Sequence, residues 1–377
     1  MSLEFIHCNL SPAFVNAICG SLCMDSNQTH GIQHFSIRTS SFLEINSVSL
    51  PLGLESFLST GRYLCSLNFR DNHLDRNFAQ MLFRILIDAF PGLSTLDLSE
   101  NNIAGWLSNF NLRKSNGLGS SSGLGKSLQS LRVLNVRGNN LHKEDAENLM
   151  YASGLMPNLE ILDISDNPIE DDGMRCLIPH FIEAPERCSP LTELKLENCE
   201  LSCSGVAQLL DTLSTSKRPL NSLSLSDNNL GSQVTGALAR FLGTIKTLNI
   251  GDIGLGSAGF RELQKGMTAE LKLVEINISK NRGGFETARF LSKLISLAPE
   301  LIAVNATYNL MPAESLSIIG SALKYTKGKL QCLDLTGNHF DYEPTHELLL
   351  AEFHCNGKPI LVFPSSHALD VPYDDDP

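Results

Sequence analysis

The segment Ser120–Ser127 resembles a site for chemistry more closely than any other stretch of the sequence. It reads Ser-Ser-Ser-Gly-Leu-Gly-Lys-Ser and ends like a phosphate-binding loop, whose backbone amides and lysine hold nucleotide phosphates. That loop needs glycine at its first position, where this chain has Ser120. It also needs a helix after Lys126, whereas a strand is expected soon afterwards, at Leu131. The segment therefore does not predict a nucleotide site.

Metal ligation and nucleophilic catalysis are the other chemistries considered. His346 and Glu347 begin like the zinc-binding helix His-Glu-x-x-His, but Leu350 stands where the second histidine is required. No serine or cysteine has a nucleophile motif around it. We therefore expect no catalytic residue, no metal ligand and no cofactor, and predict that the protein is not an enzyme. Two cysteine pairs are four residues apart without a nearby histidine: Cys19 and Cys23, and Cys199 and Cys203.

Acidic side chains form the most regular polar pattern in the chain. They alternate with leucines that are expected to face the core of strands, so they should face the opposite surface. Parallel strands lie about 5 Å apart, so carboxylates of successive repeats would form a continuous acidic stripe. We expect this stripe to bind a protein with a basic surface, although a solvated face of an acidic protein would look the same. The stripe comprises Asp97, Glu100, Asp163, Asp166, Glu193, Glu197, Asp227 and Asp252.

The elements that position these residues are repeats of the pattern Leu-x-x-Leu-x-Leu-x-x-Asn-x-Leu. Its asparagine position recurs twelve times, mostly 28 or 29 residues apart. This is typical of a leucine-rich repeat solenoid, an α/β fold with parallel strands on the concave face and helices on the convex face. Asparagine occupies the position in eight repeats: Asn72, Asn101, Asn139, Asn167, Asn228, Asn281, Asn309 and Asn338. Cys8, Ser40, Cys199 and Ile253 occupy it in the other four.

A buried asparagine at this position should stabilise the turn after each strand. Its amide is both donor and acceptor, so it can satisfy its own turn and that of the adjacent repeat. Cysteine can take this place in such repeats, whereas Ile253 cannot form side-chain hydrogen bonds. The repeat that ends at Ile253 is also the shortest, at 25 residues. We therefore expect an irregularity there.

Helices are indicated by a second periodicity. Ten residues after the asparagine position the chain is apolar in eleven of twelve repeats, and the residue four further on often continues the pattern. An apolar i, i+4 pair forms one face of a helix. The repeat of Asn101 departs from this pattern, because a Gly/Ser/Asn-rich insertion over residues 106–127 replaces its helix. Trp106 is expected to cover that incomplete repeat, the alternative being an exposed binding hot spot.

We expect two parts: residues 1–355 as the solenoid, and 356–377 as a capping strand followed by an acidic tail. The first repeat lacks its opening leucine, which suggests a fragment of a longer protein.

The composition of the chain limits the classes of partner and the compartment. A net charge of −12 argues against direct nucleic-acid contact, and no 18-residue apolar run predicts a membrane span. Ten scattered cysteines favour a reducing compartment, the nucleus or the cytoplasm.

Two segments carry a resemblance to a known subfamily. Residues 96–103 read Leu-Asp-Leu-Ser-Glu-Asn-Asn-Ile, and residues 223–230 read Leu-Ser-Leu-Ser-Asp-Asn-Asn-Leu. Together with the repeat length, they resemble ribonuclease-inhibitor-type leucine-rich repeats over the whole chain. This resemblance concerns the fold.

A narrower resemblance is to the C-terminal leucine-rich region of plant Tonsoku proteins. It rests on residues 162–173, Leu-Asp-Ile-Ser-Asp-Asn-Pro-Ile-Glu-Asp-Asp-Gly, and 134–141, Leu-Asn-Val-Arg-Gly-Asn-Asn-Leu. It implies a nuclear scaffold in replication-coupled DNA repair, chromatin inheritance and cell-cycle progression. Histone recognition in that family belongs to a tetratricopeptide region and is not carried over. Two alternatives stay open: a regulator resembling Ran GTPase-activating proteins, and the sensing region of an intracellular immune receptor.

Overall fold

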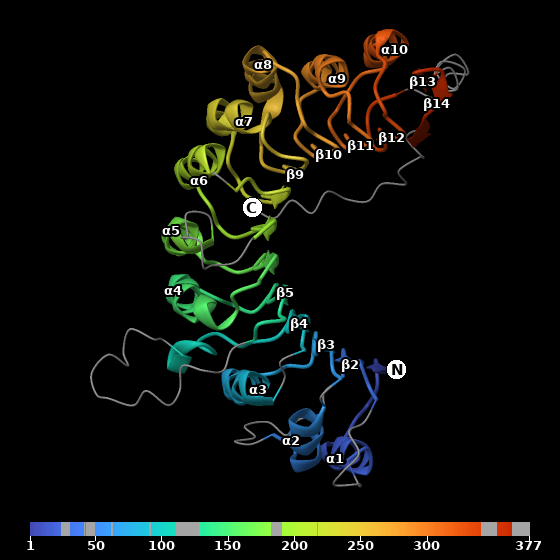
Figure 1. The fold of residues 1–377 in the computed structure, drawn as a ribbon. Helices are drawn as coiled ribbons and strands as arrows, with labels where there is room; N and C mark the ends of the chain where they lie inside the picture. The colour runs from blue at the N-terminus through green and yellow to red at the C-terminus, as the bar shows by residue number, and fades with distance from the viewer. Residues whose placement is uncertain are drawn as a thin grey trace. The chain divides into compact units, whose positions relative to one another are not determined.

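The computed structural model describes residues 1–23, 31–40, 42, 50–61, 63–89, 92–110, 128–181, 191–216, 218–340 and 353–363. The chain forms two compact units, Met1–Glu200 and Leu201–Pro377, each of which is described by itself (Figure 1). Several predicted features lie outside the described residues: the phosphate-loop-like segment, the His346–Glu347 motif, most of the 106–127 insertion and the acidic tail.

The first unit alternates parallel strands with helices, and each strand pairs in register with the next along the chain. Its strands are β1 (Ser2–Ile6), β2 (His34–Arg38), β3 (Ser66–Asn68), β4 (Thr95–Asp97), β5 (Val133–Asn135), β6 (Ile161–Asp163) and β7 (Glu193–Lys195). Its helices are α1 (Pro12–Ser21), α2 (Leu52–Thr60), α3 (Arg76–Ala89), α4 (Lys143–Ala152) and α5 (Glu170–Phe181), with 3₁₀ turns η1 (Ser108–Phe110) and η3 (Ser153–Leu155).

The second unit repeats this alternation. Its parallel strands are β8 (Ser222–Ser224), β9 (Thr247–Asn249), β10 (Glu275–Asn277), β11 (Ala303–Asn305), β12 (Cys332–Asp334) and β15 (Leu361–Phe363). Its helices are α6 (Cys203–Thr215), η4 (Ser232–Val234), α7 (Thr235–Phe241), α8 (Gly256–Gly266), α9 (Phe285–Leu297) and α10 (Ser315–Tyr325). A short antiparallel pair, β13 (His354–Cys355) and β14 (Lys358–Pro359), precedes β15. The predicted α/β leucine-rich repeat solenoid is confirmed, with helices on one side of the strands in each unit (Figure 1).

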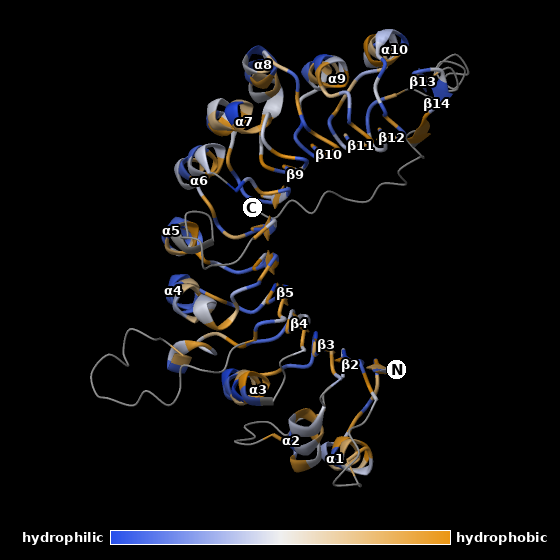
Figure 2. Ribbon diagram, viewed as in Figure 1, coloured by the Kyte–Doolittle hydropathy of each residue, from blue (hydrophilic) through white to orange (hydrophobic). Residues whose placement is uncertain are grey.

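The core lies between the strands and the helices of each repeat. Leu67, Leu96, Leu134 and Leu162, the central residues of consecutive strands, are completely buried. Hydrophobic and hydrophilic residues alternate along the same strands and helices (Figure 2). This alternation places one face of each element in the core and the other in solvent.

The asparagines connect adjacent repeats through their side chains, as Asn167 illustrates. Its Oδ1 accepts hydrogen bonds from the backbone amides of Asn139 and Leu141 in the preceding repeat, both at 2.9 Å. Its Nδ2 donates to the carbonyl of Val136 at 3.0 Å and to two carbonyls of its own turn. Asn101, Asn281 and Asn338 make the same kinds of bond.

The residue just before the asparagine position is left-handed in all twelve repeats. Its φ lies between 45° and 71°, a region that few residues other than glycine adopt readily. The twelve residues are His7, Thr39, Asp71, Glu100, Gly138, Asp166, Asn198, Asp227, Asp252, Lys280, Tyr308 and Gly337. The turn after each strand therefore has the same geometry in every repeat, although only two of these residues are glycine.

The irregularity expected near Ile253 is present. Ile253 is buried, and its backbone carbonyl accepts from the amide of Leu230 at 3.0 Å, whereas the equivalent amide of Leu141 donates to the side chain of Asn167. The short repeat before it also has a shorter helix, because α7 spans seven residues and begins after a 3₁₀ turn.

Trp106 covers the incomplete repeat, as expected. The side chain is 2% exposed and its ring packs against Phe83 with centroids 5.1 Å apart. The alternative of an exposed binding hot spot is therefore wrong.

Candidate protein-binding surface

The eight residues of the acidic stripe are divided between the two units, and most do not lie on strands. Asp97 and Asp163 end β4 and β6, and Glu193 begins β7. The prediction that the others alternate along strands is wrong. The strands are three residues long here, so the rest lie in the turns that follow: Glu100, Asp166 and Glu197 in the first unit, Asp227 and Asp252 in the second.

Asp97 and Asp163 have a structural role that the sequence analysis missed. The Oδ1 of Asp97 accepts from the amide of Ser99 at 3.0 Å, and that of Asp163 from the amide of Ser165 at 3.1 Å. Six more residues, four before the asparagine position, make the same bond to the amide two residues on: Asn68, Asn135, Asn249, Asn277, Asn305 and Asp334. The sequence carried a signal for this role, because the position four residues before the asparagine position is Asn or Asp in these repeats. Asp163 is 8% exposed, so little of it faces solvent.

Arg137 neutralises two carboxylates of the first unit. Its Nε lies 2.5 Å from Asp166 Oδ2, and its Nη1 lies 2.7 Å from Glu197 Oε2. Loss of hydration lowers the pKa of Arg137, but its hydrogen bond to Glu197 and the charge of Asp166 raise the pKa overall. One guanidinium therefore joins the turns of three consecutive repeats.

Basic side chains also accompany three other stripe residues of the first unit, Asp163, Glu193 and Glu100. Lys195 Nζ lies 3.2 Å from Glu193 Oε1 and 4.0 Å from Asp163 Oδ2. Arg70 Nη2 lies 4.0 Å from Glu100 Oε1. The acidic residues here are thus largely paired with cations of the same unit, which weakens their field at the surface.

The second unit presents its two stripe residues differently. Asp227 and Asp252 are exposed, lie in adjacent turns and take part in none of the salt bridges between described residues. With Asn229, Lys280 and Arg282 they line a hollow of about 700 Å³ at the carboxyl ends of β8, β9 and β10. Loss of hydration and the nearby charge of Asp227 raise the pKa of Asp252, against the opposing effect of Lys280 and Arg282.

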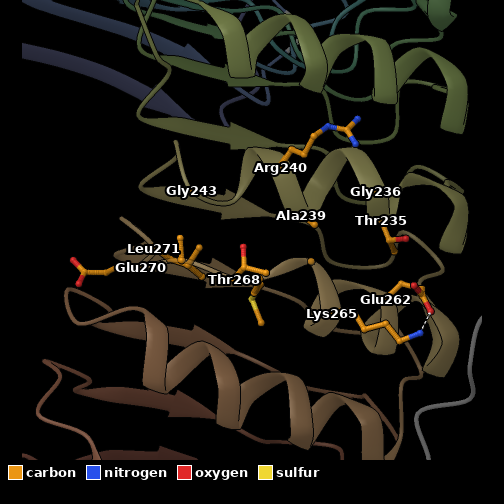
Figure 3. A pocket seen from close by; sticks show the side chains of 13 residues that line it. Thr235, Gly236, Ala239, Arg240, Gly243, Glu262, Lys265, Thr268, Glu270 and Leu271 are labelled. Carbon is orange, nitrogen blue, oxygen red and sulfur yellow. Dashed lines mark hydrogen bonds and ion pairs between the residues drawn. The ribbon is translucent and has the colours of Figure 1, made fainter.

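A second hollow, of about 600 Å³, lies between α7 and α8 in the same unit (Figure 3). Gly236, Gly243 and Gly266 contribute no side chains to it. At its rim Lys265 donates to Glu262 at 2.7 Å. The hollow occurs where the helix of the shortest repeat is only seven residues long.

Other features bear on the class of protein. Among the described residues, no three His, Cys, Asp or Glu side chains are grouped so that they could hold a metal ion. The described helices are also too short or too polar to cross a bilayer.

Comparisons with known proteins agree with this architecture. The family model described as Leucine Rich repeat matches residues 127–150 and 156–177. The chain is 25% identical over 248 residues to the Tonsoku-like protein of Mus musculus, covering 55% of this chain and 18% of that protein. It is 26% identical over 226 residues to the ribonuclease inhibitor of Mus musculus, covering 59% of this chain and 48% of that protein. The chain thus spans less than half the length of either curated relative.

One solved structure with the same kind of repeat is the leucine-rich repeat-containing protein LegL7 from Legionella pneumophila. It is 17% identical, with a TM-score of 0.49, and the match covers 86% of this chain and 98% of LegL7.

Proposed function

We propose that this chain is a non-catalytic protein-interaction scaffold. The premise is that it is a ribonuclease-inhibitor-type leucine-rich repeat protein that resembles Tonsoku. Its site of action is the nucleus, and its process is genome maintenance: replication-coupled DNA repair and cell-cycle progression. The similarity to the Tonsoku-like protein over 55% of the chain is the observation that carries the process.

The scaffold role is supported by how the polar side chains are used. The asparagines and the aspartates that end β4 and β6 bind the chain's own backbone. Acidic side chains in the turns after the strands, Asp227 and Asp252 among them, are exposed polar groups that can meet another protein. A partner with a basic surface suits them, because complementary charge speeds encounter and excludes wrong partners.

The nuclear role is tested in cells that express the tagged chain. We expect the protein to accumulate in the nucleus and to gather at sites of DNA damage when replication is blocked. Proteins recovered with it should include replication or repair factors, and the Asp227→Asn/Asp252→Asn variant should recover less of them. A protein that stays in the cytoplasm and recovers no such factor under replication stress would contradict the genome-maintenance proposal.

A ribonuclease is a useful control partner, because the other matched relative is a ribonuclease inhibitor. Titration of a purified ribonuclease with the full chain should leave its activity unchanged. Stoichiometric inhibition would replace the genome-maintenance proposal with an inhibitor role.

A further inference from the structure

Positive charge and an exposed aromatic ring occur together at the end of α10 in the second unit. Lys324 and Tyr325 are the last two residues of that helix, and Lys327 follows two residues later. All three are exposed. Tyr325 is 82% exposed, more than any other large hydrophobic side chain that the structure describes. The end of this helix therefore presents both charge and apolar surface to solvent.

A third lysine comes from the hairpin before the last strand. β13 packs against α10 (Figure 1), and a Cβ on Gly328, in the loop after α10, would lie 3.7 Å from the sulfur of Cys355 in β13. Lys358 of β14 is exposed and pairs with Cys355 across the hairpin. We call the resulting surface the lysine–tyrosine patch: Lys324, Tyr325, Lys327 and Lys358.

The lysines of the patch lack the carboxylate partners that comparable cations of this unit have. Arg240 in the last turn of α7 lies 2.6 Å from Asp211, and Lys265 in the last turn of α8 lies 2.7 Å from a glutamate. Lys324 has the same place in α10 but takes part in none of the salt bridges between described residues, and neither do the other two lysines of the patch. The dipole of α10 accounts for Lys324 at most, because its effect is confined to the last turn.

The charge of the patch is opposite to that of the whole chain, which carries −12. A nucleic acid would meet few cations here and would be repelled by the rest of the chain, since its affinity depends on the number of phosphates neutralised. A short acidic segment of a protein needs only a few cations. Tyr325 offers such a segment an amphipathic ring with few rotatable bonds, so that its immobilisation costs little conformational entropy.

We propose that the lysine–tyrosine patch binds a short acidic segment of a protein partner. Aspartate or glutamate side chains of that segment meet Lys324, Lys327 and Lys358, and an apolar side chain beside them packs on Tyr325. The proposal rests on the scaffold role above and adds a site whose partner is opposite in charge to the one that suits Asp227 and Asp252.

Selection of a random-peptide phage library tests this without knowledge of the partner. The library is first depleted on the Lys324→Gln/Lys327→Gln/Lys358→Gln variant and is then selected on the intact protein. We expect the selected peptides to combine aspartate or glutamate with an apolar or aromatic residue. The best peptide, synthesised and labelled, should bind the triple variant about tenfold or more weakly. Tyr325→Ser should weaken the same peptide about threefold or more.

The control variant Lys246→Gln/Lys272→Gln/Lys280→Gln removes three lysines from exposed positions of the same unit outside the patch. It should leave the peptide affinity unchanged, so equal losses in the two triple variants would overturn the proposal. A library that yields no enriched peptide after depletion would also overturn it, and binding indifferent to Tyr325→Ser would overturn the apolar contact.

A labelled oligothymidylate of about 20 nucleotides serves as the nucleic-acid probe. It should bind more weakly than the peptide. Tighter binding of the oligothymidylate, lost in the Lys324/Lys327/Lys358 variant, would overturn the choice of a protein segment. Each readout uses the purified chain and is independent of nuclear localisation, so failure here is distinguishable from failure of the genome-maintenance role.

Discussion

The side chain at the asparagine position of each repeat largely determines how neighbouring turns are joined. In some repeats a residue other than asparagine occupies that position. Where asparagine is present, a single amide satisfies up to five backbone groups, as at Asn167. Where Cys199 replaces it, the thiol donates to the carbonyls of Ile164 and Glu197, at 3.4 and 3.3 Å, and makes a further hydrogen bond with the backbone of Asn167. The amide of Glu170 donates to the carbonyl of Cys199, a backbone bond that is also made to the carbonyls of Asn281 and Asn309. The backbone bond between neighbouring turns is thus kept, and the cysteine changes only the side-chain bonds.

Asn167→Ala should lower the free energy of unfolding by about 2–5 kcal/mol, because several buried backbone groups lose a partner at about 1–3 kcal/mol each. Asn167→Cys should cost less, since a thiol in this position can still donate to neighbouring carbonyls. Urea denaturation of the two variants measures the difference. Equal losses for alanine and cysteine would contradict the role assigned to the side chain.

The titration of Asp252 tests the charge arrangement of the hollow. Asp227→Asn should lower the pKa of Asp252, because a like charge beside it is removed. NMR titration of the side-chain carboxyl carbon measures this pKa, and Asp211→Asn is a control, because Asp211 pairs with Arg240 elsewhere. A pKa of Asp252 that is the same in wild type and Asp227→Asn would exclude the repulsion.

The direction of the linked stability change follows from the raised pKa. The folded protein holds the Asp252 proton more tightly than the unfolded chain, so this group favours folding more as pH falls. Its unfavourable contribution is present above the raised pKa and disappears below the ordinary value of 3.8.

At the scale of residues, the sequence could place the asparagines and the buried leucines but not the turn conformation. The left-handed residue before the asparagine position is His, Thr, Asp, Glu, Gly, Asn, Lys or Tyr in different repeats. The type of side chain does not predict the left-handed conformation, because hydrogen bonds between neighbouring turns impose it. The acidic residues were assigned to strands because the sequence does not show that the strands which carry or precede them, such as β4 and β6, end after three residues.

Close approach between helices depends on individual glycines. A Cβ at Gly53 of α2 would lie 2.3 Å from the carbonyl oxygen of Asn16 in α1. A Cβ at Gly20 in α1 would meet no atom within 4 Å. Absence of a side chain is thus a packing requirement at Gly53 and a cost at Gly20, where glycine disfavours the helix.

Gly53→Ala should therefore destabilise the protein by about 1–3 kcal/mol through overpacking against backbone atoms. Gly20→Ala should stabilise it by about 0.5–1 kcal/mol through helix propensity. Thermal unfolding followed by circular dichroism distinguishes the two. A stabilised Gly53→Ala protein would contradict the α1–α2 contact.

At the scale of elements, the repeat spacing predicted where the helices lie and where the pattern would fail. The 25-residue step before Ile253 predicted an irregular repeat, and α7 is correspondingly short. The spacing could not predict the hollow between α7 and α8, because that depends on which side chains are missing from two facing helices. Gly236, Gly243 and Gly266 line this hollow without side chains.

For the molecule as a whole, net charge and paired charge have different consequences. The chain carries −12, with 29 basic and 41 acidic residues. In the first unit many carboxylates are already matched by Arg137, Lys195 and Arg70. Long-range attraction of a basic partner therefore comes from the overall charge, whereas selectivity comes from the few side chains that meet the partner directly.

Association with a synthetic peptide rich in Lys and Arg should accordingly be sensitive to salt. Raising the ionic strength from about 0.01 M to about 1 M shortens the Debye length from about 30 Å to about 3 Å, which screens the overall charge. The association rate should fall by about tenfold or more, while the dissociation rate changes less, because contacts inside the hollow are at short range. Stopped-flow fluorescence measures both rates. The Asp227→Asn/Asp252→Asn variant should instead release the peptide faster. The variant loses the direct contacts but keeps most of the net charge. A salt effect found entirely in the dissociation rate would mean that the overall charge does not guide the partner.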